Sequence, residues 1–424
     1  MRFYPLVRRE RTSNTGWLAV AATALVAGII CGCGGGGSKS KVVYAVGPDS
    51  PNVAIFAVSG SGELAPVGSP VSTGSAPDAI AIDPAHRFAY IVDSTNGIGP
   101  GGVSQYILDP KSGNLAVATF SATNGTTPPA TPAETGTNPV AIVIDDTGTF
   151  VFVANQGSDS ISVFIIDEIG CSGVCGNGTL TEIKQPAPGP IPPNCVLNSP
   201  VPCPLSIVPA SPTALATSGK MLFVATSNAG AGSVSTYAFD STTGVVTTPA
   251  AFTTAVDLNP SAMTMDASGK FLFLTDSGAS EVEVLSIASS GQLTPVSQSA
   301  PCAVHTCATG PTPLNVWVHP SGKFLYTANQ GSTVNGTSCV NGGVSAFSID
   351  GSGALTQLSG SPFAAGPCPS YAATDSSGGF LFVANAGNNN TISVFTIDST
   401  GALKQEGSPS PSIVINPVAL ASIN

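Results

Sequence analysis

The chain repeats one pattern of short strands seven times, and this repetition constrains its fold more than any other feature. The pattern is clearest over residues 138–180, where an apolar run ends in an Asp-x-x-Gly turn and a second apolar run ends in Ala-Asn. A third, alternating run follows, and Gly-x-Leu begins a fourth. Short apolar runs bounded by Gly, Asn and Asp are typical of β-strands joined by turns. One such unit has two open edges, so it is not expected to fold alone.

Three independent markers give the same count of seven. The second strand carries a central aromatic residue in each unit: Tyr44, Tyr90, Phe152, Phe223, Phe273, Tyr326 and Phe382. The third strands contain Val53, Val103, Ile161, Val234, Val282, Val344 and Ile392. The fourth strands follow Gly62, Gly113, Gly178, Gly244, Gly291, Gly353 and Gly401. Radial β repeats of this size are typical of propellers, so we predict an all-β fold, a seven-bladed β-propeller of four-stranded antiparallel blades.

The two ends of the repeat region complement each other. The first unit begins at Lys41 without a first strand, and residues 416–423 have the pattern of a first strand with no blade after it. A ring closes if the C-terminal strand completes the first blade, because this removes both free edges. We therefore predict a single propeller domain over residues 41–424, although the chain length alone would suggest two or three domains.

Residues 1–33 have the composition of an export signal. Four arginines precede an apolar run, Trp17 to Ile30, that is too short to span a bilayer comfortably. The residues Ile30-Cys31-Gly32-Cys33 resemble a bacterial lipoprotein signal, in which Cys33 would be acylated after cleavage; a plain secretory signal is the alternative. We expect residues 34–40 to form a Gly/Ser linker and the protein to lie in the bacterial cell envelope, with membrane contact only through the lipid anchor.

Eight further cysteines lie in predicted loops. Their even number is typical of disulfides in an oxidising compartment. The predicted pairs are Cys171 with Cys175, Cys195 with Cys203, Cys302 with Cys307, and Cys339 with Cys368. Metal binding by Cys171 and Cys175, or by Cys302 and Cys307 with His305, is the alternative. Because exported cysteine pairs are usually disulfides, we expect no metal and no other cofactor.

The chain after the signal is strongly acidic. Four of the 13 cationic residues and one of the 24 acidic residues lie in the signal, which leaves 9 cations and 23 acids. Nucleic acid and anionic lipid headgroups are poor partners for such a chain. We call the face that carries the turns between first and second strands the bottom, and Arg87 and several lysines fall there. The opposite, top face is nearly free of cations, which argues against a phosphorylated substrate.

The repeat resembles the lactonase family of seven-bladed propellers, which includes proteins of the 6-phosphogluconolactonase type. The resemblance covers roughly residues 41–424 and is clearest at Asp145–Leu180, His319–Leu355 and Asp375–Leu403. It implies hydrolysis of a sugar lactone by acid, histidine and arginine side chains near the central mouth. The repeat itself encodes the blade and not a pocket, so it does not fix the activity.

Candidate functional residues lie in the top-face loops. His305 is a candidate general base, with Glu134 and Asp276 as candidate catalytic acids; a solvent-exposed loop histidine is the alternative interpretation. Asn155, Asn329 and Asn385 end second strands, and their amides suit sugar hydroxyls or the capping of their own turns. Asp93 and Asp257 complete the candidate ligand-binding residues.

Two classes of function remain open at this point. The first is a monomeric binding protein that recognises an unknown protein or glycan through its top-face loops. The second is an enzyme, a lactonase acting on an uncharged sugar lactone. The enzyme requires His305 and at least one acid to converge on a common pocket, whereas the binding protein requires only an ordered surface. A quinone-dependent dehydrogenase is disfavoured. Propellers of that class resemble rings whose blades pack against one another through tryptophan side chains, and this chain has only Trp17 and Trp317.

Overall fold

Seven antiparallel sheets and one short hairpin make up the part of the chain that the computed structural model describes. The described residues are 41–95, 99–118, 132–167, 178–185, 205–206, 211–228, 231–248, 250–298, 302–303, 305–334, 338–387, 390–412 and 414–423. Residues 39–424 form one unit and residues 1–38 another. The predicted signal with Cys33, the linker, and Cys171, Cys175, Cys195 and Cys203 lie outside the described residues. Within them, no helix has the length and apolarity needed to cross a membrane.

The first three blades follow the predicted order of strands, whereas in blade 4 the residues after Gly244 form only an isolated bridge, Phe239 with Val246, and the strand paired with β17 lies later, at Phe252–Val256. Blade 1 contains β36 (Ala419–Ile423), β1 (Val42–Gly47), β2 (Ser50–Val58), β3 (Leu64–Pro66) and β4 (Val71–Ser72). Blade 2 contains β5 (Pro77–Ile82), β6 (Phe88–Asp93), β7 (Pro100–Leu108), β8 (Leu115–Val117) and β9 (Ala133–Thr137). Blade 3 contains β10 (Pro139–Ile144), β11 (Phe150–Asn155), β12 (Ser160–Ile166), β13 (Leu180–Glu182) and β14 (Leu205–Ser206), with the 3-10 turn η2 (Gln156–Ser158) after β11. Blade 4 contains β15 (Pro212–Ser218), β16 (Met221–Asn228), β17 (Ala231–Ala238) and β18 (Phe252–Val256).

The other three blades repeat the arrangement. Blade 5 contains β19 (Pro260–Met265), β20 (Phe271–Asp276), β21 (Glu281–Ile287), β22 (Leu293–Pro295) and β23 (Thr306–Ala308). Blade 6 contains β24 (Pro313–Val318), β25 (Phe324–Asn329), β28 (Gly343–Ile349), β29 (Leu355–Gln357) and β30 (Phe363–Ala364), and the hairpin of β26 (Ser332–Val334) and β27 (Ser338–Val340) extends from it. Blade 7 contains β31 (Pro369–Thr374), β32 (Phe380–Asn385), β33 (Thr391–Ile397), β34 (Leu403–Gln405) and β35 (Ser410–Pro411).

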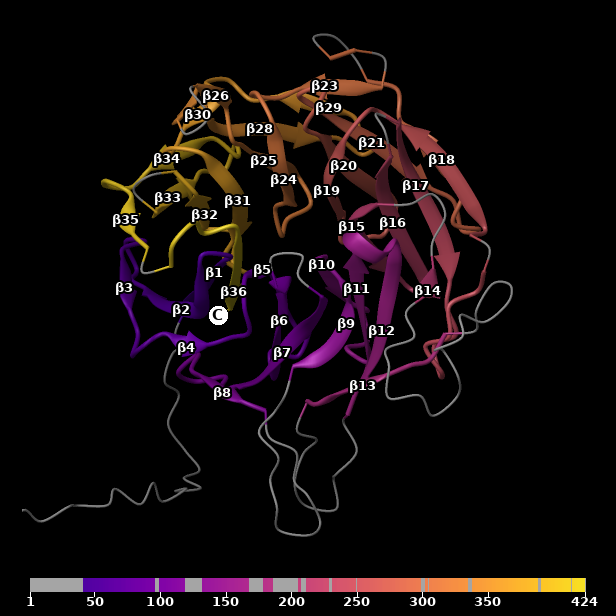
Figure 1. Ribbon diagram of the computed structural model, residues 1–424. Coiled ribbons are helices and arrows are strands. Elements are labelled where there is room, and N and C mark those ends of the chain that lie inside the picture. Colours follow the sequence, from indigo (N-terminus) through magenta and orange to yellow (C-terminus); the bar gives the residue numbers. More distant parts are fainter. Residues whose placement is uncertain are drawn as a thin grey trace, which may run out of the picture. The chain divides into compact units, whose positions relative to one another are not determined.

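The ring closes as predicted, through the C-terminal strand. Strand β36 pairs antiparallel with β1, with Val42 opposite Ile423 and Tyr44 opposite Ala421. The seven innermost strands, β36, β5, β10, β15, β19, β24 and β31, each contact the next around the ring and surround a common centre (Figure 1). Blade 1 is thus built from both ends of the propeller domain.

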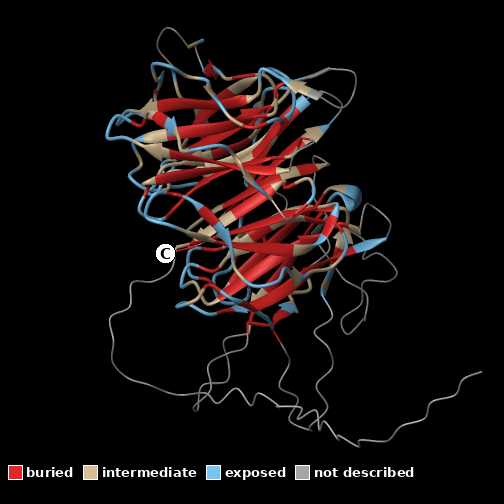
Figure 2. Cartoon of the chain, turned by 90° about the vertical axis from the view of Figure 1, so that its left-hand side faces the viewer, coloured by how far each residue is buried: buried red, intermediate tan, exposed pale blue. Residues whose placement is uncertain are grey.

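The seams between blades form the core of the ring. All seven second-strand aromatic residues are fully buried, and the buried positions run along the strands while the exposed ones gather in turns and edges (Figure 2). The seven fourth-strand glycines all have a positive φ. A Cβ added to any of them would lie less than 3.0 Å from a side chain of the preceding blade. The Gly-x-Leu marker therefore encodes both a turn and the close approach of two blades.

Hydrogen bonds cross the same seams. The Tyr44 hydroxyl donates to the Gly113 carbonyl of the next blade at 2.6 Å, and Tyr90 and Tyr326 make the equivalent bond at 2.8 and 2.9 Å. The backbone N–H of Leu180 donates to Gln105 Oε1 of the preceding blade at 2.6 Å. Such bonds satisfy polar groups that the packing removes from water.

Aspartates organise the bottom turns. The Asp145 Oδ1 atom accepts hydrogen bonds from the backbone N–H groups of Thr149 and Phe150, both at 2.7 Å, and Asp83 caps its turn in the same way. The guanidinium Nε of Arg87 donates to Asp83 Oδ2 at 2.9 Å. The predicted bottom-turn position of Arg87 is therefore confirmed, and its charge is paired within its own turn.

Two of the predicted disulfides lie among the described residues, and both are present. Cys302 pairs with Cys307. Cys339, on β27 of blade 6, pairs with Cys368, which directly precedes β31 of blade 7. The second bond therefore links two neighbouring blades, as the sequence predicted.

Two glycines of one turn provide a test of the seam. Gly353 has φ +83°, and a Cβ there would lie 2.6 Å from Phe271 Cδ1, whereas a Cβ on Gly351 would meet nothing within 4 Å. We expect Gly353→Ala to lower the free energy of unfolding by about 1–3 kcal/mol, because it adds backbone strain and overpacking. Gly351→Ala should change it by less than about 0.5 kcal/mol. If urea denaturation showed that the two substitutions lower the free energy of unfolding equally, Gly353 would not be in close contact with the preceding blade.

Candidate functional site

A β-bulge at the same position of six of the seven innermost strands shapes the top of the central channel. The proline that begins β5 pairs with Asp93, but the next pair joins Ala79 to Val92, so Asp78 is the extra residue. Strands β10, β15, β19, β24 and β31 show the same shift. We call the side chains at this position, together with Val418 of blade 1, the bulge layer: Asp78, Val140, Thr213, Ser261, Leu314, Ser370 and Val418. Bulges re-aim side chains and occur often beside functional sites.

The bulge layer lines the upper channel, a cavity of about 310 Å³. All seven innermost strands or their leading residues contribute to its wall, which is otherwise mainly apolar. Among the described residues of this lining, Asp78 is the one ionisable acid or base apart from the phenol of Tyr371. Burial raises the pKa of Asp78, and the Ser94 hydroxyl partly opposes this shift.

A second hollow, which we call the mouth groove, opens from the upper channel on the top face. It has a volume of about 410 Å³, and Val140, Thr213 and Ser261 line both spaces. The other polar side chains of its wall belong to Gln156, Ser211, Ser227, Asn259 and Ser277 of blades 3 to 5. No charged side chain lines the groove among the residues that the structure describes. Hydroxyls and amides without charge are suited to a polyhydroxylated ligand.

A third cavity of about 350 Å³ occupies the lower half of the channel. Ile80, Ile142 and Tyr371 line both halves and form the boundary between them. The Trp317 indole, which lines the lower half, donates its N–H to Thr374 Oγ1 at 3.0 Å. The lower wall thus combines aliphatic and aromatic side chains with polar ones, among them His86, Thr374 and Asp375.

Asp276 holds the groove wall in place. Its Oδ2 atom accepts from the backbone N–H of Asn259 at 2.8 Å, and its Oδ1 atom accepts from Gly278 and Ala279 at 2.7 Å each. The Ser227 hydroxyl donates to Asn259 Oδ1 at 2.7 Å. The Asp276 carboxylate, which was expected to be catalytic, is therefore hydrogen-bonded to backbone N–H groups of its own turn. It also positions Asn259, which the sequence did not single out.

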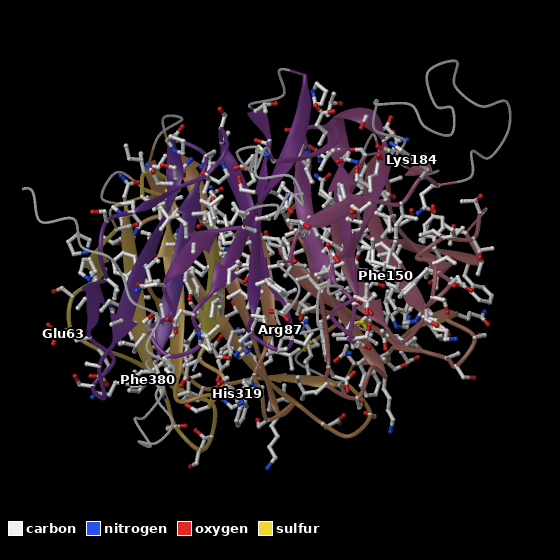
Figure 3. All side chains as sticks on the ribbon, turned by 90° about the horizontal axis from the view of Figure 1, so that it is seen from below. Glu63, Arg87, Phe150, Lys184, His319 and Phe380 are labelled. Carbon is white, nitrogen blue, oxygen red and sulfur yellow. A yellow bond between two sulfur atoms is a disulfide. The ribbon has the colours of Figure 1, made fainter. Side chains whose placement is uncertain are left out.

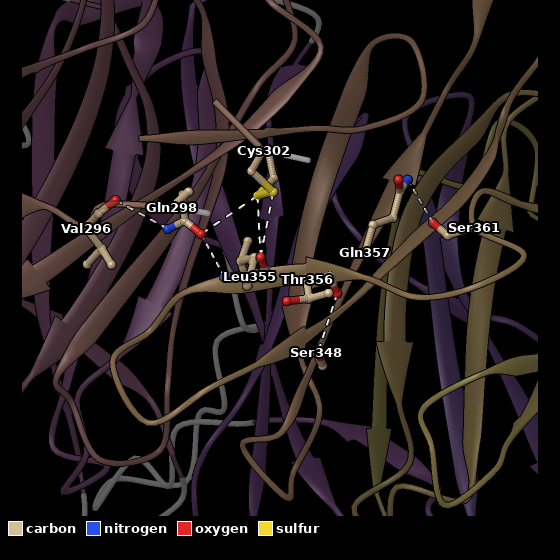
Figure 4. Close-up of a disulfide and its surroundings, with 9 residues drawn as sticks. Val296, Gln298, Cys302, Ser348, Leu355, Thr356, Gln357 and Ser361 are labelled. Carbon is tan, nitrogen blue, oxygen red and sulfur yellow. Dashed lines mark hydrogen bonds between the residues drawn. A yellow bond between two sulfur atoms is a disulfide. The ribbon is translucent and has the colours of Figure 1, made fainter. Parts of the chain in front are cut away.

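The three predicted catalytic residues do not converge on one pocket. His305 is exposed beside β23, which pairs with β21 on the outer side of blade 5. The disulfide of Cys302 and Cys307 packs there against the Leu355 carbonyl of blade 6 (Figure 4). Glu134 is exposed on β9, in blade 2. Their catalytic role stays a prediction that this geometry does not support.

The three asparagines expected to bind ligand are buried within their blades. Asn155, Asn329 and Asn385 are fully buried at the top ends of their second strands. The Asn155 Nδ2 atom donates to Ser162 Oγ at 3.0 Å, and the other two amides make the equivalent bond to a third-strand serine at 2.9 and 3.0 Å. These side chains join second to third strands, and a role in contacting ligand stays untested. Asp257 is exposed and lies in the link before β19.

Asp93 occupies the position that Asn155 holds in blade 3. It is 2% exposed, and the Ser104 hydroxyl donates to its Oδ2 atom at 2.6 Å. Its Oδ1 atom has no hydrogen-bond partner within the described chain. Burial raises the pKa of Asp93 to about 7. In blade 5, burial and the negative charge of Asp257 raise the pKa of Glu283 to about 7 as well.

Cationic side chains lie away from the upper channel and the mouth groove. No lysine, arginine or histidine lines either space among the described residues. Arg87 and His319 lie toward one side of the ring and Lys184 toward the other (Figure 3), and Lys184 forms an ion pair with Glu182. The described residues contain no group of three or more His, Cys, Asp or Glu side chains arranged to hold a metal ion.

Sequence reasoning missed the bulge layer and the groove wall. A usable signal was present, because each innermost strand begins with Pro-x-Ala or a close variant, and the variable residue is polar in four units: Asp78, Thr213, Ser261 and Ser370. Polar residues in an otherwise apolar strand point to a position with a special orientation.

The fold and the polar channel define a seven-bladed propeller with a site on its axis. The family model described as lactonase, seven-bladed β-propeller, matches residues 41–170, 202–304 and 299–409. The chain therefore belongs to the lactonase family. A search of curated proteins found no match.

Solved structures show the same fold. A candidate 6-phosphogluconolactonase from Bacteroides fragilis is 19% identical, with a TM-score of 0.64 over 92% of this chain and 100% of its own. A second from Bacteroides uniformis is 17% identical, with a TM-score of 0.64 over 91% and 99%. The periplasmic gluconolactonase of Pseudomonas aeruginosa is 19% identical, with a TM-score of 0.60 over 91% and 99%. At these identities the likeness extends to the fold alone.

The raised pKa of Asp93 predicts how stability depends on pH. Between the ordinary carboxyl pKa of 3.8 and about 7, the unfolded chain has lost this proton while the folded chain keeps it. Stability should therefore fall with rising pH across this window, by about 1.4 kcal/mol per pH unit for one group, and level off above it. We expect Asp93→Asn to flatten this part of the curve and to be more stable than wild type at pH 8.

The substitution copies the residue that blades 3 and 7 carry at this position, so it should fold. Urea denaturation at pH 5 and pH 8 measures the effect, and Glu134→Gln, an exposed acid of the same blade, serves as control. Because Glu283 titrates in the same window, the wild-type slope will persist in part. Identical slopes for wild type and Asp93→Asn would refute the assignment.

Proposed function

We propose that this protein is an exported binding protein whose ligand is a polyhydroxylated molecule without phosphate or carboxylate groups, of the sugar or sugar-lactone class, bound in the mouth groove and the upper channel. One observation carries the proposal: among the described residues, the walls of both spaces offer hydroxyls and amides and contain no cationic side chain. A phosphate or a carboxylate would find no countercharge there. Of the two partner classes expected from the sequence, a concave polar groove favours a glycan over a protein surface.

Export and lipid anchoring through Cys33 are part of this proposal. Two disulfides among the described residues support an oxidising compartment. The basic and apolar composition of residues 1–33 supports a signal peptide. A structural relative from Pseudomonas aeruginosa is a periplasmic gluconolactonase, which is in accord with an extracytoplasmic propeller. Incorporation of labelled palmitate into the wild type and not into Cys33→Ser would test the anchor.

Hydrolysis of an uncharged sugar lactone is the second candidate. The observation in its favour is Asp78, a carboxyl group on the channel wall whose pKa is raised by burial. Such a group can take a proton from water as a general base. Catalysis would then require Asp78 rather than the residues expected from the sequence, and Asp78→Asn should reduce lactone opening by about 100-fold or more. If the wild-type protein opened the lactone no faster than water does, the lactonase proposal would be wrong and only the binding function would remain.

Calorimetric titration of the purified full chain tests the binding function. Glucono-δ-lactone and glucose should bind, and glucose 6-phosphate should bind at least about tenfold more weakly. Thr213→Val removes a hydroxyl that lines both spaces and should weaken binding about tenfold. Thr356→Val, at an exposed position on β29, is the matched control and should have no effect. Tighter binding of the phosphorylated sugar would contradict the proposal.

A further inference from the structure

The polar side chains of the bulge layer offer hydrogen-bond acceptors rather than donors. The Ser261 hydroxyl lies 2.7 Å from the Pro313 carbonyl oxygen of the next blade, and the Ser370 hydroxyl lies 2.6 Å from the Pro417 carbonyl oxygen. Because a carbonyl only accepts, each serine must donate its single proton outward to the wall. The remaining lone pairs of both oxygen atoms are acceptors.

The other two polar side chains of the layer follow the same rule. The Thr213 hydroxyl donates a hydrogen bond to the Ala225 carbonyl oxygen at 3.4 Å. Asp78 contributes a carboxylate, which when ionised accepts and does not donate. The remaining members, Val140, Leu314 and Val418, are apolar. The side chains of this layer therefore present acceptors and one negative charge.

No positive charge compensates Asp78 from the wall. The residues that line the upper channel include no lysine, arginine or histidine among those described. The neighbouring strand β6 ends in Asp93, a second carboxyl, opposite Pro77. Asp93 is 2% exposed, and its Oδ1 atom has no hydrogen-bond partner within the described chain. The Asp78 carboxylate, with no cationic side chain beside it among the described lining residues, makes this side of the channel attractive to positive charge.

We propose that the upper channel recognises a protonated amino group, so that the preferred ligand is an amino sugar or a similar hydroxylated amine whose ammonium group binds the Asp78 carboxylate and the acceptor hydroxyls of the bulge layer. An ammonium group carries three donors and no acceptor, which matches a layer of acceptors. Its charge-assisted bond to a half-buried carboxylate is stronger than a bond between neutral groups. The inference rests on the proposed function, because the mouth groove would hold the hydroxyls of the same molecule.

A divalent cation is a weaker match for the same carboxylates. Calcium and magnesium need several oxygen ligands in a defined geometry. The described residues contain no cluster of three or more His, Cys, Asp or Glu side chains that fits a metal. A single ammonium group requires only one carboxylate and nearby acceptors.

Titration calorimetry of the full chain with glucosamine, N-acetylglucosamine and glucose tests the inference. N-acetylglucosamine keeps the hydroxyls and removes the charge. We expect glucosamine to bind at least about tenfold more tightly than the other two sugars, with a preference that shrinks as salt is added. Asp78→Asn should abolish the preference, so that glucosamine and glucose then bind with similar affinity. Glu63→Gln, at an exposed acid of blade 1, is the control and should keep the preference.

The outcomes separate this inference from the proposed function. If glucose and glucosamine bind equally and Asp78→Asn changes neither, the amine preference is wrong while the neutral-ligand site stands. If no sugar binds, charged or uncharged, both are wrong. If Ca²⁺ binds, loses its affinity in Asp78→Asn and blocks glucosamine, Asp78 serves a metal site and the inference is overturned. Circular dichroism and the melting temperature of Asp78→Asn confirm that the variant is folded.

Discussion

Close contact between neighbouring blades is the constraint on which the rest of this molecule depends. A four-stranded sheet of this kind has little to stabilise it alone, and each blade buries its aromatic second-strand residue only because the next blade lies against it. The approach is possible because a glycine with positive φ faces the preceding blade at all seven seams. Tyrosine hydroxyls and glutamine side chains then satisfy turn groups across several of these seams. The ring thereby fixes the angle at which each innermost strand meets the axis.

The same regularity explains what the sequence could predict. The aromatic residues, the glycines and the first-strand pattern at residues 416–423 recur at fixed places in the repeat, so the blades and the ring closure could be predicted from them. The pairing of Cys339 with Cys368 was predicted separately, by joining neighbouring cysteines. The site did not follow. Asp276 looked like a free acid at a strand end, but whether a carboxylate faces ligand or its own turn depends on a few ångströms of backbone. Asp78 stood inside an apolar strand, and only the bulge turns it toward the channel.

The positions that vary between blades are the ones that the proposed function places in contact with ligand. Repeat-encoded polar groups such as Asn155 and Asp145 are occupied in holding strands and turns together. By contrast, the bulge layer carries a carboxylate, hydroxyls or an apolar side chain at the same backbone position. Under the proposed function, variation at this layer would change the ligand without changing the ring, and one fold can serve many activities in this way. The family resemblance therefore describes the scaffold and does not fix the chemistry on the axis.

The pairing of β1 with β36 also determines when this ring can be completed. Val42 lies near the start of the propeller domain, and its partner Ile423 lies in β36, the last strand of the ring in sequence order. During synthesis, the first blade therefore keeps an open strand edge until β36 has been made. Pairings of such long sequence separation form slowly, and an exposed strand edge promotes aggregation. A nascent chain of this design is thus most vulnerable just before β36 is made, and a product that lacks β36 would keep that edge permanently.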